Sequence, residues 1–228
     1  EILGAVKFLR LLRTYHFNER RVQQIIQLRE GNWEPDEHGR MHYVSGGIRC
    51  PGTDRGHVYR WQPFQIFVLA SVFGFYNWFD TEVEIDTREP MLTERENPLS
   101  NHIEDFRRLC NYFVLYTPRK TDKTGMSAFI QVVFFLLGDY NSEVYCCANA
   151  EFQSRILFER TTFMLSGIDN RHRFDITKKQ IRWKPQFHSV RNAMIMPLTA
   201  GGKTKDGPFA ELVNWDELGS SPYTNGKS

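Results

Sequence analysis

Apolar residues recur at helical spacing over residues 3–29 and are interleaved with basic side chains. This pattern predicts two short amphipathic helices with a break over residues 14–18. The favoured interpretation of the charges is a solvent-exposed face on a packing helix, and the alternative is a surface for DNA or a partner. The basic residues are Lys7, Arg10, Arg13, Arg20 and Arg21.

The stretch 31–57 is rich in turn-forming residues and is predicted as a loop. An apolar run over residues 64–79 predicts a buried helix that ends between Gly74 and Asn77. Residues 80–106 are acidic and contain proline, which predicts another loop. We therefore expect an N-terminal helical segment and loop over residues 1–57, followed by the main domain over 58–228.

From residue 107 onward, strand-like and helix-like patterns alternate. Strand, loop, helix, strand and helix are predicted in turn over residues 107–116, 117–124, 125–140, 142–148 and 150–167. The first strand is apolar enough to be buried, and Gly167 closes the second helix. Further short strands are predicted within residues 172–198, and a last strand ends on Asp216 and Glu217. This order is the βαβ pattern of a three-layer α/β domain with a parallel sheet.

Composition narrows the possible classes of protein. The chain has 228 residues, 41% of them apolar and 14% aromatic, which is typical of a globular domain. Its 29 Lys and Arg against 27 Asp and Glu leave a net charge of only +2, so any DNA contact must be local. The four cysteines lack the spacing of zinc or redox motifs and favour a reducing, cytoplasmic compartment. No uninterrupted apolar stretch reaches the roughly 20 residues of a membrane span.

Residues 116–128, YTPRKTDKTGMSA, have the pattern of a phosphate-binding loop with one glycine replaced by Asp122. Such loops surround phosphates with backbone N–H groups and a helix N-terminus. Lys123 would contact phosphate and Thr124 would bind Mg²⁺. A basic, exposed turn between a strand and a helix is the alternative interpretation. The preceding turn consists of Thr117, Pro118, Arg119, Lys120 and Thr121.

Two further stretches have side chains suited to nucleotide chemistry. Asp216 and Glu217 close a predicted strand about 90 residues after the loop. A βαβ crossover can bring residues this far apart to neighbouring strand ends. Asp216 would hold Mg²⁺, directly or through water, and Glu217 would polarise the attacking water. A solvated turn is the alternative. Upstream, RWQPFQIF places Gln65 or Gln62 beside aromatic side chains, a combination that can stack on a base and bind its edge.

The order of these motifs resembles that in the ATPase domain of the large terminase subunit of tailed bacteriophages. The matching stretches are Gln65 with FGF downstream, TPRKTDKT, EVYCCANAEFQSRILFE and PLTAGGKTKDGPFAELVNWDE, within about residues 58–219. The resemblance implies a P-loop NTPase fold, three-layer α/β/α, with a mostly parallel central sheet and an N-terminal helical segment. It also implies ATP and Mg²⁺ as cofactors.

By position, the resemblance implies nucleotide binding by the loop Pro118, Arg119, Lys120, Thr121, Asp122, Lys123 and Thr124, with Gln65 on the adenine side. It implies catalytic roles for Glu217, Lys123 and Arg119, and metal binding by Thr124 and Asp216. An arginine from a neighbouring subunit would complete the site, and Arg155 and Arg160 are candidates. The basic cluster within residues 170–180 predicts DNA contacts at Arg171, Arg173, Lys178 and Lys179, and a solvated loop is the alternative interpretation.

The implied function is hydrolysis of ATP to drive viral DNA into a procapsid, in the cytoplasm of a bacterial host. The implied partners are double-stranded DNA, the portal protein, the small terminase subunit and further copies of the chain in a ring, without a membrane. The family also carries a C-terminal nuclease, for which 228 residues leave no room. Because the first residue is Glu1 and not Met, we expect the chain to be part of a longer protein.

The chain departs from the family pattern at Asp122, where the loop has glycine, and at Asn214, inside a strand that is usually apolar. The Asp122 carboxylate either pairs with Arg119 or Lys120 or faces the nucleotide. A like charge ~4 Å away costs about 4 kcal/mol at an effective dielectric near 20, and would weaken ATP binding roughly a thousandfold. Two other classes therefore stay open, a nucleotide-blind structural or partner-binding relative and another P-loop motor such as a helicase.

Overall fold

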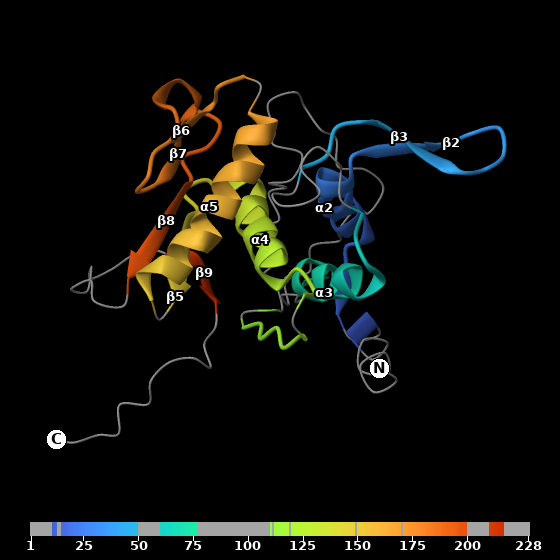
Figure 1. The fold of residues 1–228 in the computed structure, drawn as a ribbon, viewed down its shortest axis with the longest axis horizontal. Coiled ribbons are helices and arrows are strands. Elements are labelled where there is room, and N and C mark those ends of the chain that lie inside the picture. Colours follow the sequence, from blue (N-terminus) through green and yellow to red (C-terminus); the bar gives the residue numbers. More distant parts are fainter. Residues whose placement is uncertain are drawn as a thin grey trace, which may run out of the picture. The chain divides into compact units, whose positions relative to one another are not determined.

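A computed structural model describes residues 11–12, 15–49, 60–76, 110, 112–118, 120–148, 150–169, 171–199 and 210–216. The chain forms two compact units, which consist of residues 1–49 with 56–116 and of residues 50–55 with 117–228 (Figure 1). The predicted division into residues 1–57 and 58–228 stays a prediction. No helix in the described ranges combines the length and apolar character that crossing a bilayer requires.

Two helices form the centre of the first unit, α2 (Glu19–Glu30) and α3 (Pro63–Phe73). Asn18 caps α2 by accepting a hydrogen bond from the Arg21 N–H at 2.9 Å. Trp61 joins the two helices, because its backbone N–H donates to Glu30 Oε1 at 2.6 Å and its ring lies 4.2 Å from the Arg29 guanidinium. The predicted break between two N-terminal helices is occupied by a short strand, β1 (His16–Phe17), which pairs antiparallel with β4 (Phe75–Tyr76).

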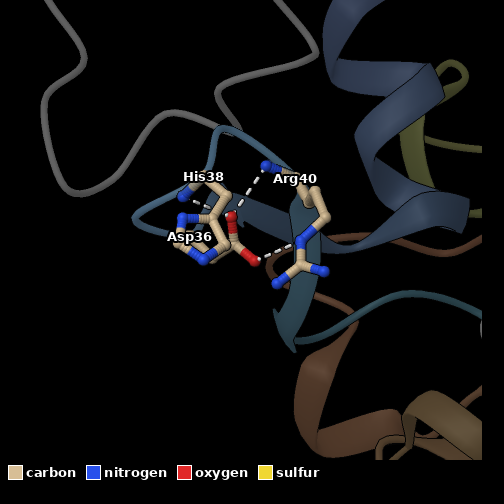
Figure 2. Close-up of polar contacts among 3 residues, drawn as sticks. All are labelled: Asp36, His38 and Arg40. Carbon is tan, nitrogen blue, oxygen red and sulfur yellow. Dashed lines mark hydrogen bonds and ion pairs between the residues drawn. The ribbon is translucent and has the colours of Figure 1, made fainter.

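A β-hairpin replaces part of the loop predicted over residues 31–57. Strands β2 (Asn32–Pro35) and β3 (Met41–Ser45) pair antiparallel. In the turn, Asp36 accepts hydrogen bonds from the backbone N–H groups of His38 and Arg40 and from Arg40 Nε at 2.9 Å (Figure 2). The bond from the Arg40 N–H is the main cause that lowers the Asp36 pKa. Sequence analysis missed the hairpin because its strands are short and mostly exposed.

A five-stranded mixed sheet with helices packed against it forms the second unit. Its elements are α4 (Lys123–Leu137), β5 (Glu143–Ala148), α5 (Glu151–Ile168), β6 (Phe174–Ile176), β7 (Ile181–Trp183), a 3₁₀ turn (Pro185–Phe187), β8 (Met194–Thr199) and β9 (Ala210–Asp216). The strand order is β6-β7-β8-β5-β9. The β8-β5 and β5-β9 pairs are parallel, and the β6-β7 and β7-β8 pairs are antiparallel. The α/β class is thus confirmed, with a sheet that is parallel only around β5.

A buried glutamine marks where both helices meet the sheet. Gln131 Oε1 on α4 accepts hydrogen bonds from Thr161 Oγ1 on α5 at 2.7 Å and from Cys146 Sγ on β5 at 3.1 Å. Helices α4 and α5 therefore cover the same face of the sheet. Val213 and Trp215 alternate along β9 with Asn214 and Asp216, and both are exposed in the described part of the chain.

An aromatic cluster attaches the β6-β7 hairpin to α4. Phe135, Phe174 and Trp183 lie with ring centroids 4.9–5.9 Å apart. Edge-to-face and offset packing of this kind adds to the stabilisation from burial. The predicted short strands within residues 172–198 are confirmed by this hairpin and β8.

Two sequence-based expectations differ from the structure in detail. Of the strand predicted over residues 107–116, the described residues 112–116 form no regular structure, and the side chains of Tyr112, Val114 and Tyr116 are 89–98% exposed. Residues 107–109 and 111 lie outside the described residues. The second helix continues through Gly167 to Ile168, with Asp169 as its C-cap. A strand needs a neighbouring edge for its backbone hydrogen bonds, which an apolar sequence alone does not supply.

Candidate nucleotide-binding site

Three side chains predicted for the nucleotide site meet where α4 begins and β9 ends. Lys123 Nζ lies 3.6 Å from Asp216 Oδ1, and Thr124 Oγ1 donates a weak hydrogen bond to Asp216 Oδ2 at 3.5 Å. Lys123 and Thr124 are the first two residues of α4, and Asp216 is the last residue of β9. Residues 92 positions apart in the chain are thereby brought together.

Asn214 fixes the start of α4 relative to β9. Its side-chain amide donates to the Ser127 carbonyl in the first turns of α4 at 2.9 Å. An amide inside a strand is unfavourable without a partner, and this carbonyl provides one. Asn214 faces α4 from the same side of β9 as Asp216, so the hydrogen bond holds the carboxylate near Lys123. The hydrogen bond to Ser127 therefore gives a local structural reason for a polar residue at position 214 of the strand.

Left-handed backbone at two positions shapes the loop before α4. Lys120 has φ 68° and Asp122 has φ 56° with ψ 36°, and Asp122 is the N-cap of the helix. Glycine adopts this region freely, while aspartate tolerates it better than most residues. Thr121 Oγ1 adds hydrogen bonds at 2.9 Å to the Pro118 carbonyl and to Thr117 Oγ1. The backbone of Asp122 thus has the conformation that a loop glycine would supply.

The Asp122 carboxylate lies on the side of the loop next to α5. Asp122 Oδ1 is 3.6 Å from Arg160 Nη1, and both side chains are partly exposed. The carboxyl group also lies against Gly125, since a Cβ added at Gly125 would be 2.6 Å from Asp122 Cγ. Among the described residues, Asp122 forms an ion pair with Arg160. Arg119 lies outside the described residues, and the predicted pairing with Arg119 or Lys120 stays a prediction.

The pair Thr124 and Asp216 is chemically suited to Mg²⁺. Both offer hard oxygen donors, and Mg²⁺ in phosphate-binding proteins is held by one or two protein oxygens with waters and substrate phosphates as the other ligands. The described residues contain no group of three or more His, Cys, Asp or Glu positioned around one ion. A magnesium ion bound here would therefore depend on phosphate oxygens for the rest of its coordination.

Gln65 lies in the first unit, near the beginning of α3. Its side chain is fully buried, and its Oε1 accepts a hydrogen bond from the Gln62 N–H at 3.0 Å. Its Nε2 is buried and has no partner within the described ranges. The adenine-side role stays a prediction.

The predicted DNA-contacting residues are divided between two ends of β6. Lys178 and Lys179 are exposed at the tip of the β6-β7 hairpin, where the Thr177 N–H donates to the Gln180 carbonyl at 2.9 Å. Arg171 and Arg173 precede β6. Arg173 Nε lies 3.5 Å from Asp169 Oδ1, and its guanidinium lies 5.1 Å from the Phe174 ring centroid. Lys178 and Lys179, like Arg171, are therefore more accessible than Arg173.

The structure says less about the other predicted site residues. Arg119 and Glu217 lie outside the described residues. Arg155 pairs with Glu151 of the same helix at 2.9 Å, and both side chains are exposed. The contributions of Asn214 and Gly125 were missed by sequence analysis. The contact of Gly125 with Asp122 could have been predicted from their spacing, because residues three positions apart lie on the same face of a helix.

Comparison of the chain with protein-family models, with curated protein sequences and with solved structures gave no significant match. The assignment of a function therefore rests on the residues and on their geometry.

Proposed function

We propose that the chain is an ATPase domain that binds Mg-ATP at the start of α4 and drives viral DNA packaging. The observation that carries this proposal is the meeting of Lys123, Thr124 and Asp216 at the N-terminus of α4. A lysine, a hydroxyl and a carboxylate at a helix N-terminus supply the three kinds of group that bind phosphates and their magnesium ion.

Each residue would act in a distinct way at the phosphates. The α4 N-terminus directs backbone N–H groups and a partial positive charge toward the anion. Lys123, 35% exposed, would move from Asp216 to the phosphates, and Thr124 and Asp216 would hold Mg²⁺, which would neutralise charge on the phosphates. Glu217, the next residue in the sequence after Asp216, would polarise the attacking water.

The same proposal includes the finer fold and the assembly. It takes the parallel strands β8, β5 and β9 as part of a three-layer P-loop NTPase core. It takes the active form as a ring at a portal protein, with the small terminase subunit and double-stranded DNA as partners. Grip on DNA would come from phosphate contacts, including those of Lys178 and Lys179, and would be independent of sequence and steeply reduced by salt.

The direct test is calorimetric titration of Mg-ATP into the wild-type chain and the Lys123→Ala variant. Loss of the lysine should abolish measurable binding, because the phosphates lose a charged hydrogen-bond donor. Lys179→Ala is the matched control, since it removes an exposed lysine from the β6-β7 hairpin, away from the start of α4 in the sequence, and should leave ATP affinity unchanged. Equal binding by wild type and Lys123→Ala, or binding by neither, would refute the proposal.

Hydrolysis is tested separately with Glu217→Gln. The amide keeps the shape of the side chain but cannot accept the proton of the attacking water. Phosphate release should therefore fall while Mg-ATP binding persists. An unchanged rate would assign the catalytic carboxylate to another position.

A second candidate function is supported by one specific observation. Residues 112–118 form no strand before the loop, although a phosphate loop ordinarily follows a buried strand. A structural or partner-binding relative without nucleotide would need neither that strand nor a glycine at position 122. Failure of the wild-type chain to bind Mg-ATP, with the fold intact by circular dichroism, is the result expected for this candidate.

A further inference from the structure

Asp122, Gly125 and Arg160 form a separate cluster next to Lys123. Asp122 is the N-cap of α4, Gly125 lies in the first turn, and Arg160 comes from α5. The carboxyl group fits against the α carbon of Gly125, where a methyl group would leave a separation of only 2.6 Å to Cγ. Its Oδ1 then lies 3.6 Å from Arg160 Nη1.

The two carboxylates near the loop have different partners. Asp216 on β9 is next to Lys123 and Thr124, whereas Asp122 is next to Arg160 and packs on Gly125. The negative charge that replaces the loop glycine is thus directed toward a cation on another helix. An unpaired carboxylate at this point would repel a phosphate group, while a paired one would repel it far less.

We propose that Arg160 is a positioning residue that neutralises Asp122 and holds its carboxylate against Gly125, so that the N-terminus of α4 can accept a phosphate-bearing ligand. This inference rests on the proposed nucleotide site and deepens it. Arg160 acts here within its own chain and through Asp122, without touching the ligand. Gly125 leaves room for the carboxylate in this position, where a Cβ would lie 2.6 Å from Asp122 Cγ and would displace the carboxyl group.

A double-mutant cycle separates this role from a direct contact with phosphate. The chains are wild type, Arg160→Gln, Asp122→Gly and the double variant, titrated with Mg-ATP and with inorganic tripolyphosphate. In the presence of Asp122, Arg160→Gln should weaken both ligands by about tenfold or more, because the carboxylate loses the positive charge of Arg160. In the Asp122→Gly background the same change should alter affinity by less than about twofold.

Two further variants control for a merely structural effect. Arg160→Lys keeps the charge and should retain most of the affinity that Arg160→Gln loses. Gly125→Ala should weaken both ligands when Asp122 is present, because the methyl group displaces the carboxylate. With glycine at position 122 the same Gly125→Ala change should be harmless and should raise the melting temperature, since alanine favours a helix over glycine.

The possible outcomes are distinguishable. Equal weakening by Arg160→Gln in both backgrounds would mean direct ligand contact or general damage, and no weakening in either would mean no role, so both overturn the inference. Binding by Asp122→Gly without binding by wild type would show that the carboxylate is not neutralised, which overturns the inference but keeps the site. Absence of binding in every chain would overturn the proposed function itself.

Discussion

Residues 112–116 and helix α4 lie on either side of the same short loop in the sequence, and both are strongly apolar. In α4, Phe129, Val132 and Phe135 are completely buried, whereas Tyr112, Val114 and Tyr116 are almost fully exposed. A helix satisfies its backbone hydrogen bonds within itself, while a strand requires the edge of a neighbour. Apolar sequence therefore identifies segments that favour burial, but a strand forms only where a partner strand is available.

The largest test of this difference compares one phenylalanine from each region. Phe129→Ala should lower the free energy of unfolding by about 3–5 kcal/mol, because it leaves a cavity between α4 and its neighbours. Phe113→Ala, at a side chain already 42% exposed, should cost less than about 1 kcal/mol. Urea denaturation followed by circular dichroism measures both. Similar losses for the two variants would contradict the difference in burial.

The same contrast explains which elements the sequence predicted. Helix α4, strand β5 and strand β9 carry long apolar or period-two patterns bounded by turn residues, and all three were located from sequence. The β2-β3 hairpin was missed because its strands are mostly exposed and its turn depends on the Asp36 side chain. The antiparallel order of β6 and β7 was also not predictable, since strand pairing depends on contacts between distant segments.

Site residues were predictable to the extent that their chemistry is visible in their own type and spacing. Lys123, Thr124 and Asp216 were named from a motif and are found together. The partner of Asp122 was not predictable, because Arg160 lies on another helix and its approach depends on how α4 packs against α5. The hydrogen bond of Asn214 was unpredictable for the same reason. Motifs specify side-chain chemistry, and tertiary packing specifies the partners.

A pH dependence extends the comparison to the cysteines, two of which are buried in β5 while Cys110 is partly exposed. Burial raises the pKa of Cys146 in β5 to about 12 and also raises that of Cys147. An unperturbed thiol titrates near 8.5, so the unfolded chain loses its protons first as the pH rises. The contribution of these thiols to the free energy of unfolding should be fully present below about pH 8.5. It should then decrease toward pH 12, by about 1.4 kcal/mol per pH unit for Cys146.

The measurement is the free energy of unfolding at pH 8.5, 9.25 and 10 in wild type and Cys146→Ala. The alanine variant should show a shallower decline, whatever its stability at neutral pH. Cys110→Ala is the control, because Cys110 is partly exposed and precedes the 112–116 segment. A wild-type stability that stays constant up to pH 10 would contradict the burial of the β5 thiols.

Polar contacts to α4 allow a finer comparison, since Gln131 is buried among groups from α5 and β5. Thr161→Val removes the 2.7 Å hydrogen bond to Gln131 Oε1 while keeping the shape of the side chain. The expected loss is about 1–2 kcal/mol, because a buried acceptor loses a donor. Ser166→Ala on the exposed side of α5 is the control and should change stability by less than about 0.5 kcal/mol. Equal effects would mean that the buried network adds nothing beyond packing.

The smallest expected effect concerns the exposed segment itself. Val114→Ser should change the free energy of unfolding by no more than about 0.5 kcal/mol, because its side chain is 89% exposed and loses almost no buried surface. Val144→Ser in β5, at a fully buried position, is the matched comparison and should cost several times more. A loss above about 1 kcal/mol for Val114→Ser would indicate that residues 112–116 are buried in solution, as the sequence pattern predicts. It would also restore the strand that a phosphate-binding loop requires, and so would favour the nucleotide-binding function over the nucleotide-blind alternative.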